Sequence, residues 1–437
     1  MSVVIIGTVR SNDYIVATLA TSERKRFDWL VIGLYLGLVV FGWVNIYAAC
    51  YNEMHSNVFD FAAQHGKQLL WIGIAFIVAI CVLFIQPRFF SNGSYIIYGV
   101  VLLLLVATLF VGTVTNGGQS WIDFGAFKLQ PSEFAKFATA LVLAKYISAI
   151  DLDITLMRTK LTLALLTAVP AGLILLQHDT GSALVFLAFL LAFYREGLSQ
   201  YFLLVGVLAI ALFVAALLVN RYVLMGVVLV LCLLYLFVWL SKRSSRNYWH
   251  TLWFFLACCL FISLVDFAFN HVLESHQRDR IYVLLGKVED PQGVGYNVDQ
   301  AKIAIGSGGL VGKGFLNGTI TKADFVPEQE TDFIFCTVGE EWGFVGCIVL
   351  VAAYVILLIR LVSMAERQRS TFARFYGYSV ASILFFHFFI NIGMVLGLVP
   401  VIGIPLPFFS YGGSSLIAFT LLLFVFIRQD ADRNALI

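Results

Sequence analysis

Long apolar runs separated by short polar segments make up most of this 437-residue chain. About 20 apolar residues in a helix cross the hydrocarbon core of a bilayer. Two of these runs are weaker candidates for membrane-spanning helices, because 182–195 is short and 133–150 contains charged residues. Without them, the chain would have about ten or eleven such helices. We expect an all-α polytopic integral membrane protein with about 12 transmembrane helices, at 28–50, 68–86, 95–114, 133–150, 160–176, 182–195, 200–219, 222–241, 252–271, 332–361, 374–398 and 413–428.

Composition supports the membrane setting. The chain is 60% hydrophobic and 15% aromatic, only 12% of its residues are charged, and its mean hydropathy is +0.91. These values exclude an ordinary soluble domain. The net charge of +2 gives no reason to expect nucleic acid as a partner. The seven cysteines lie in or beside apolar runs without a CxxC spacing, so neither disulfides nor zinc are indicated.

The distribution of Lys and Arg predicts the orientation in the membrane. The basic residues concentrate in alternate short loops, and such loops usually face the cytoplasm. This rule predicts a cytoplasmic N-terminal segment at 1–27, one transmembrane domain at 28–428 and a cytoplasmic tail at 429–437. The same parity places the only long hydrophilic stretch, 271–331, outside the cytoplasm. The first helix is expected to be an uncleaved signal anchor.

Asp332 lies where this hydrophilic stretch meets the next apolar run. A carboxylate at a bilayer boundary is costly to desolvate, which makes Asp332 a functional candidate. Clustered glycines and basic residues in the loop suit a phosphate or pyrophosphate, although turns between short amphipathic segments explain the glycines equally well. The spacing is not that of a nucleotide-binding loop. The candidate anion-binding residues are Arg278, Arg280, Lys302 and Lys313.

Two further polar segments are expected on the same side of the membrane. In 116–136, Glu133 and Lys136 share a helix face, either as a cap with an intrahelical ion pair or as a charged pair that lines a wet cleft. We favour the cleft. Asp179 lies in the short connection at 177–182, where it serves either as a helix cap or as a site residue.

A fourth segment, 400–415, is rich in Pro and Gly at membrane depth and includes Ser410. Irregular backbone is tolerated there only when it is buried in protein or lines a cavity. We therefore predict a re-entrant wall, and we expect all four polar segments to converge on one site.

The amino-acid sequences of these segments resemble those of the SEDS family (shape, elongation, division and sporulation). The motifs at 304–314, 326–335 and 391–415 carry the resemblance, and they look more like the elongation (RodA-like) type than the division type. Recognisable similarity covers roughly 30–200 and 275–430. The usual core of this family has ten helices, so 200–271 is expected to hold about two extra ones.

The resemblance implies a peptidoglycan glycosyltransferase that polymerises lipid II at the outer face of the bacterial cytoplasmic (inner) membrane, together with a class B penicillin-binding protein. The family's essential carboxylate falls on Asp332, a second acidic position falls on Asp324, and the charged pair falls on Glu133 and Lys136. The chain departs from the family at Ser120, where an Arg is usual, and at Glu330, where a His is common. Glu330 adds a carboxylate near Asp332.

The chemistry expected from the resemblance is attack of a sugar hydroxyl on an anomeric carbon, with lipid pyrophosphate leaving. Asp332 would act as the general base. The basic residues named above, Lys136 among them, would neutralise the pyrophosphate, and a divalent cation, Mg²⁺ or Mn²⁺, could share this task. Two alternatives are a flippase for lipid-linked precursors and a scaffold for the penicillin-binding protein without activity of its own.

Overall fold

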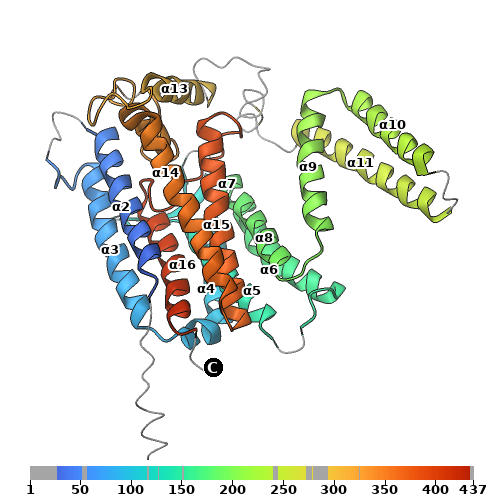
Figure 1. The fold of residues 1–437 in the computed structure, drawn as a ribbon, viewed down its shortest axis with the longest axis horizontal. Helices are drawn as coiled ribbons and strands as arrows, with labels where there is room; N and C mark the ends of the chain where they lie inside the picture. Colours follow the sequence, from blue (N-terminus) through green and yellow to red (C-terminus); the bar gives the residue numbers. More distant parts are fainter. Residues whose placement is uncertain are drawn as a thin grey trace, which may run out of the picture.

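The computed structural model describes residues 27–51, 57–115, 118–125, 127–149, 152–239, 245–271, 278, 294–323 and 325–433. Its helices form an elongated bundle, with one short helix lying across an end (Figure 1). The helices of the bundle are α2 (Trp29–Ala49), α3 (Gln64–Phe84), α4 (Pro87–Val111), α5 (Pro131–Ile147), α6 (Met157–Leu176), α7 (Thr180–Leu184), η2 (Val185–Ala188), α8 (Phe189–Arg195), α14 (Ile334–Glu366), α15 (Thr371–Val395) and α16 (Gly413–Ala431). The remaining helices are α9 (Tyr201–Leu218), α10 (Arg221–Trp239), α11 (Ser245–His271) and α13 (Val294–Ser307).

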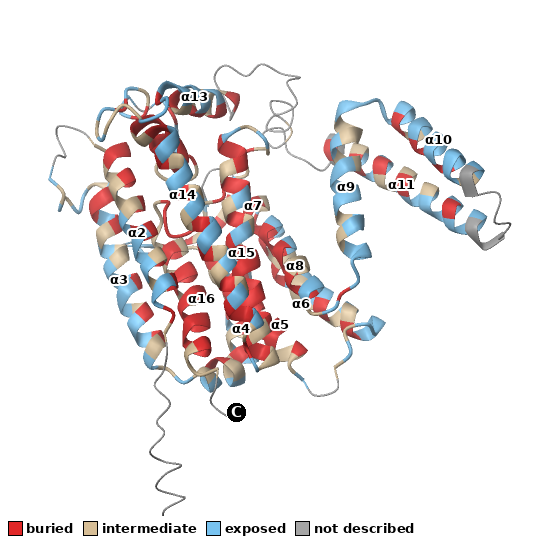
Figure 2. Cartoon of the chain, viewed as in Figure 1, coloured by how far each residue is buried: buried red, intermediate tan, exposed pale blue. Residues whose placement is uncertain are grey.

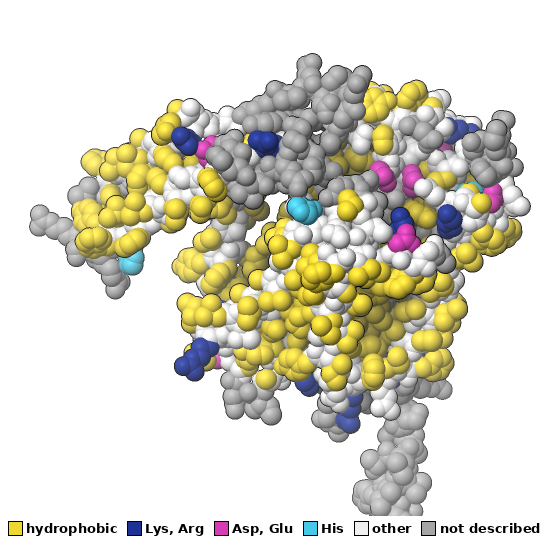
Figure 3. All heavy atoms as spheres, turned by 180° about the vertical axis from the view of Figure 1, so that it is seen from behind, with side chains coloured by type: hydrophobic (Ala, Val, Ile, Leu, Met, Phe, Trp, Pro, Cys, Tyr) yellow, Lys and Arg dark blue, Asp and Glu magenta, His cyan; other side chains and the backbone are white. Residues whose placement is uncertain are grey.

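Each run predicted to span the membrane is helical over most of its described residues. Within the described residues, 9 helices are long and apolar enough to cross a bilayer. The segments Thr180–Arg195 and Arg221–Phe237 are apolar but shorter, and α5 has only 17 residues. A band of hydrophobic side chains crosses the bundle, and charged side chains gather near its ends (Figure 3). The protein is therefore a mostly helical membrane protein.

Burial separates the inner helices from the outer ones (Figure 2). In the most apolar window of α15 and of α16, 72% and 78% of the residues are buried, whereas the value for α9 is 6%. All these windows are hydrophobic, so hydropathy alone does not distinguish a helix surrounded by protein from one that faces lipid. The core lies around α5, α15 and α16.

Two details differ from the sequence-based expectation. The chain is not entirely α-helical, because β1 (Thr113–Thr115), β2 (Gly118–Asp123) and β3 (Lys128–Leu129) form a small antiparallel sheet in the order β1-β2-β3. These strands are too short to give a clear alternating pattern. At the other end of the chain, α16 continues to Ala431 and buries Asp430, so the first residues of the expected tail belong to the last helix.

The region expected to hold extra helices forms an arm beside the bundle (Figure 1). Helices α9, α10 and α11 pack together around their own small apolar cluster, which includes Leu224, Val228 and Ile262. An ion pair between Arg221 and Asp266 (2.7 Å) joins α10 to α11. The arm is thus a small packed unit of its own.

The expected outer loop, 271–331, is partly helical. Helix α13 lies across the end of the bundle, near the start of α14 (Figure 1). Gly343 breaks the helical geometry of α14 with a φ of 65°. A Cβ at this glycine would lie 2.3 Å from the backbone nitrogen of Gly312, so the kink allows the loop to pack directly against α14.

Candidate functional site

Asp332 occupies a tight turn immediately before α14. The carbonyl oxygen of Glu328, a residue with a φ of 57°, accepts hydrogen bonds from the amides of Thr331, Asp332 and Phe333 at 3.1–3.2 Å. A non-glycine residue in the left-handed region is uncommon and needs support from its surroundings. These hydrogen bonds therefore fix the backbone position from which the side chain of Asp332 extends.

Three contacts hold this turn against the rest of the bundle. The buried Gln329 donates to the carbonyl oxygen of Ala49 at the end of α2 (3.0 Å). The carbonyl oxygen of Glu330 accepts from the amide of Tyr411 (2.8 Å), and that of Asp332 accepts from Asn391 Nδ2 on α15 (2.9 Å). The side chain of Asp332 is partly exposed, and its Oδ2 lies 3.2 Å from where a Cβ on Gly403 would be.

The connection between α15 and α16, residues 396–412, is the predicted re-entrant wall. Asn391 Nδ2 also donates to the carbonyl oxygen of Ile404 (2.8 Å), so one amide group ties the connection to the Asp332 turn. The amide of Leu406 donates to Ser410 Oγ (2.9 Å), and Tyr354 donates its hydroxyl hydrogen to the carbonyl oxygen of Pro407. Irregular backbone is thus satisfied inside the protein, as a bilayer requires. Ser410 is buried and stabilises this backbone.

The four polar segments predicted to converge are in contact. The amide of Gln119 donates to the carbonyl oxygen of Gln177 (2.9 Å), which joins the first two segments. The amide of Gln130 donates to Ser414 Oγ (3.3 Å), which joins the first to the fourth. The fourth meets the third through the Asp332 turn.

Glu133 and Lys136 form a buried ion pair on α5. Lys136 Nζ lies 2.8 Å from Glu133 Oε1, and the two residues are only 1% and 3% exposed. Lys136 also donates to His387 Nε2 on α15 (2.9 Å) and lies 5.1 Å from the ring centre of Phe419. Since Lys136 can only donate, His387 carries its hydrogen on Nδ1 and donates it to the carbonyl oxygen of Pro405 (3.1 Å).

This burial corrects the interpretation that the pair lines a wet cleft. In this conformation neither side chain is open to a ligand. The pair instead joins α5 to α15 and, through His387, to the 396–412 connection.

Asp179 caps α7. Its Oδ1 accepts from the amide of Ser182 (2.9 Å), while Oδ2 accepts from Gln130 Nε2 (3.2 Å) and Ser132 Oγ (3.4 Å). The side chain is half-buried. It therefore acts as a helix cap and also joins two of the polar segments, with one edge near the surface.

The cations proposed from the loop have different environments. Lys313 Nζ lies 2.7 Å from Oε1 of the fully buried Glu340. Lys302 on α13 is exposed, and its Nζ makes a longer contact of 3.9 Å with Oδ1 of Asp299, which is also exposed. Arg278 is partly exposed. Arg280 and Asp324 lie outside the described residues. Among the described candidates, Lys302 is therefore more available to a bound anion than Lys313.

A large apolar cavity of about 990 Å³ extends along α6 and reaches the 396–412 connection beside the site. Its inner wall comes from α6, α7, η2 and α8, and its outer wall from α9 and α11. On α6 the lining runs from Lys160 to Leu175, a helical rise of about 22 Å. At the other end the lining includes Pro400, Val401 and Ile402, which directly precede Gly403 beside Asp332. We call this cavity the apolar groove.

Comparison with known proteins agrees with this architecture. The sequence model of the FtsW, RodA and SpoVE family, described as cell cycle proteins, matches residues 28–225 and 224–434. The chain belongs to this family. The peptidoglycan glycosyltransferase MrdB of Escherichia coli (strain K12) is 35% identical over 90% of this chain and 91% of its own. The peptidoglycan glycosyltransferase RodA of Treponema pallidum is 32% identical over 92% and 98%, respectively.

Solved structures of the same family have the same fold. A chain from a peptidoglycan synthase complex that coordinates polymerization and crosslinking aligns with a TM-score of 0.69 at 29% identity, over 94% of this chain and 99% of that chain. The crystal structure of the rod shape determining protein RodA of Thermus thermophilus aligns with a TM-score of 0.61 at 27% identity, over 93% and 97%.

Sequence reasoning gave no role to three polar residues that support this RodA-type site. His387 and Asn391 lie four positions apart within the predicted span 374–398, and Glu340 lies within 332–361. Polar residues inside an apolar span are a signal in themselves, because they are costly unless they have partners. Applying that rule inside each span, and not only at its ends, would have identified all three.

Proposed function

We propose that this chain is a peptidoglycan glycosyltransferase that polymerises lipid II into glycan strands during cell elongation and rod-shape maintenance. The observation that carries the proposal is the position of Asp332. Asp332 is a partly exposed carboxylate on a turn that hydrogen bonds hold in place. It lies beside Gly403, and the preceding residue, Ile402, lines the end of the apolar groove. A substrate with a sugar head and a long lipid tail needs this combination of a polar site and an apolar channel.

In the proposed reaction Asp332 is the general base. It removes the proton from the attacking sugar hydroxyl of lipid II. The hydroxyl oxygen then forms the new glycosidic bond to the anomeric carbon of the growing chain. The bond from that carbon to the pyrophosphate oxygen breaks, and the lipid pyrophosphate leaves with the electron pair.

The apolar groove is proposed to hold the polyprenyl part of the substrate. Its lining is almost wholly hydrocarbon, and its length of about 22 Å along α6 is a large part of the ~30 Å hydrocarbon core. An extended lipid chain bound there would present its head at 400–403, beside Asp332. Lys302, Arg278 and Arg280 remain as candidates to neutralise the pyrophosphate.

A divalent cation remains part of the proposal through the substrate. Mg²⁺ and Mn²⁺ favour carboxylate and phosphate oxygens and are often held mainly by substrate phosphates. Among the described residues no group of three His, Cys, Asp or Glu side chains forms a ready-made metal site. A cation carried by the pyrophosphate would add neutralising charge, and no step above depends on it.

The topology and the partner complete the proposal. We propose twelve membrane crossings in one domain at 28–428, with both termini in the cytoplasm and the loop 271–331 outside the cytoplasmic (inner) membrane. The partner is a class B penicillin-binding protein that crosslinks the glycan strands. The relation to a peptidoglycan synthase complex supports this choice.

The decisive experiment is polymer formation from lipid II by the full-length protein. The protein is purified with its cognate penicillin-binding protein, whose transpeptidase is inactivated, and wild type is compared with Asp332→Asn. Asp153→Asn is the matched control, since Asp153 is an exposed carboxylate in the connection between α5 and α6. We expect glycan strands from wild type and from Asp153→Asn, and none from a folded Asp332→Asn.

Other outcomes would contradict the proposal. If Asp332→Asn formed polymer at the wild-type rate, Asp332 would not be the general base. No polymer from any variant in an intact complex would favour the flippase or the scaffold.

A further inference from the structure

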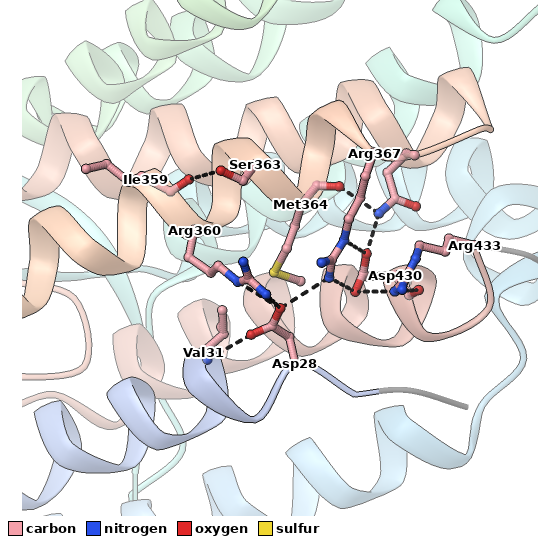
Figure 4. Close-up of polar contacts among 10 residues, drawn as sticks. Asp28, Val31, Ile359, Arg360, Ser363, Met364, Arg367, Asp430 and Arg433 are labelled. Carbon is pink, nitrogen blue, oxygen red and sulfur yellow. Dashed lines mark hydrogen bonds and ion pairs between the residues drawn. The ribbon is translucent and has the colours of Figure 1, made fainter. Parts of the chain in front are cut away.

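A network of charged side chains joins the ends of α2, α14 and α16 at the end of the bundle away from Asp332 (Figure 4). Asp28 caps α2 through the amide of Val31 (3.4 Å). Its Oδ2 also accepts from Arg360 Nε (2.9 Å) and Arg367 Nη2 (3.2 Å). Since Arg360 lies 26 residues after the start of α14, it is about 39 Å along the helix from the Asp332 end.

A second carboxylate, Asp430 on α16, completes the network. It accepts from Arg367 Nε (2.9 Å), Gln368 Nε2 (2.7 Å) and Arg433 Nη1 (3.2 Å). Asp28 and Asp430 are 7% and 0% exposed, respectively. The side chains of Arg360, Arg367 and Arg433 are 40%, 31% and 23% exposed. The buried aspartates therefore fix three guanidinium groups and leave part of each open.

These arginines line a cavity of about 290 Å³ together with Asp28 and residues at the start of α2. Three positive and two negative side chains leave the network with one excess positive charge. Within the described part of the chain, Arg360 Nη1 and Arg433 Nη2 make no hydrogen bond or ion pair. The cavity therefore offers free, prearranged N–H donors to an anion.

The rim of the cavity is apolar on the side of α2. Trp29 is 73% and Leu30 is 51% exposed, and both line the cavity. Tryptophan at the end of a membrane-spanning helix favours the headgroup level. A ligand bound here would meet guanidinium groups at one end and lipid-facing side chains at the other.

We propose that this cavity binds a phosphate-bearing anion, supplied by the headgroup of an anionic membrane lipid. Basic pockets at the ends of transmembrane helices recognise such headgroups. Each arginine near the membrane surface contributes a similar amount to the free energy of binding. The acyl chains of the lipid would lie along Trp29 and Leu30. The bound lipid would join α2, α14 and α16, the same helix ends that the ion pairs connect.

The test measures lipid binding to the purified full-length protein by native mass spectrometry. Phosphatidylglycerol, phosphatidylcholine and glycerol 3-phosphate are titrated in turn into wild type, Arg433→Gln and Arg360→Gln. Arg369→Gln is the matched control, because Arg369 is exposed near the same helix ends but does not line the cavity. We expect tighter binding of phosphatidylglycerol than of phosphatidylcholine, a loss of about fivefold for each cavity variant and no change in Arg369→Gln.

The remaining arms distinguish the sources of the phosphate. Glycerol 3-phosphate that binds as tightly as phosphatidylglycerol would identify a soluble phosphate compound as the source; weaker binding supports the lipid. If Arg360→Gln does not fold, Arg433→Gln carries the test, since Arg367 and Gln368 still satisfy Asp430. Equal binding of the two phospholipids, or unchanged phosphatidylglycerol binding in a folded Arg433→Gln, would overturn the proposal.

Discussion

The ion pair between Glu133 and Lys136 allows a direct test of whether the charges on α5 hold the site together or contact the substrate. Both side chains are almost completely buried, and their charged atoms are 2.8 Å apart. Removing one partner leaves an uncompensated buried charge, which costs about 3–5 kcal/mol. We expect Lys136→Met and Glu133→Gln each to lower the Tm by about 3–5 °C.

Removing both charges should be much less harmful than the two separate losses suggest. The double variant Glu133→Gln with Lys136→Met keeps the side-chain volumes and leaves no unpaired ion, so we expect a coupling free energy of at least about 2 kcal/mol. The assay is thermal unfolding of the purified protein, followed by tryptophan fluorescence. Lys145→Met is the control, because Lys145 lies in the last turn of the same helix and bonds only weakly, to Ser91 at 3.3 Å.

Polymerisation by the same variants then separates the two roles. Because neither side chain is open to a ligand, the double variant should recover polymerisation together with its stability. A double variant that is as stable as wild type yet makes no polymer would refute this reasoning, since the charges would then have to meet the substrate. Additive losses of stability would show that the two side chains do not act as a pair.

Three further predictions concern other parts of the fold. A Cβ at Gly181 would lie 2.2 Å from a backbone oxygen of the 396–412 connection, so Gly181→Ala should cost about 1–3 kcal/mol and most of the polymerisation activity, while Gly172→Ala, which meets open space, should change neither. Glu340→Gln should speed amide hydrogen exchange at 319–321, whose backbone N–H groups donate to that carboxylate; unchanged exchange would contradict this. Burial tends to raise the pKa of Asp28, but hydrogen bonding and the charge of a neighbouring arginine hold it below its ordinary value. Its contribution to stability should therefore be complete above about pH 4 and be lost as the pH falls through the lowered pKa, so the Tm gap between wild type and Asp28→Asn should close in acid.

The sequence predicted the helices well because most of the apolar runs have the length that a membrane-spanning helix needs. It did not distinguish α15, which is buried, from α9, which is exposed, because both helices are apolar enough to span a membrane whether lipid or protein surrounds them. The small sheet at 113–129 was missed for a different reason. Its strands are short and are held by antiparallel pairing, and such pairing leaves little trace in hydropathy.

The site was predicted in its parts but not in their roles. Asp332 and the polar segments around it follow from the cost of placing polar groups at a membrane boundary. The role of Lys136 could not be derived, because the sequence does not show that His387, far away in the chain, accepts from its ammonium group. Asn391 was likewise visible only as part of a motif, although one amide group of this residue bonds both the Asp332 turn and the 396–412 connection.

The two walls of the apolar groove are built in different ways, and this difference bears on how the proposed lipid chain is accommodated. The inner wall, from α6 to α8, belongs to the main core, and Asp179 joins it to the polar site through Gln130 and Ser132. The outer wall comes from α9 and α11, which pack around a separate apolar cluster. The three contacts described above for the Asp332 turn come from α2, α15 and the 396–412 connection. The region with the extra helices can therefore reshape the groove without moving the carboxylate, so any change it makes to lipid selection need not alter the chemistry at Asp332.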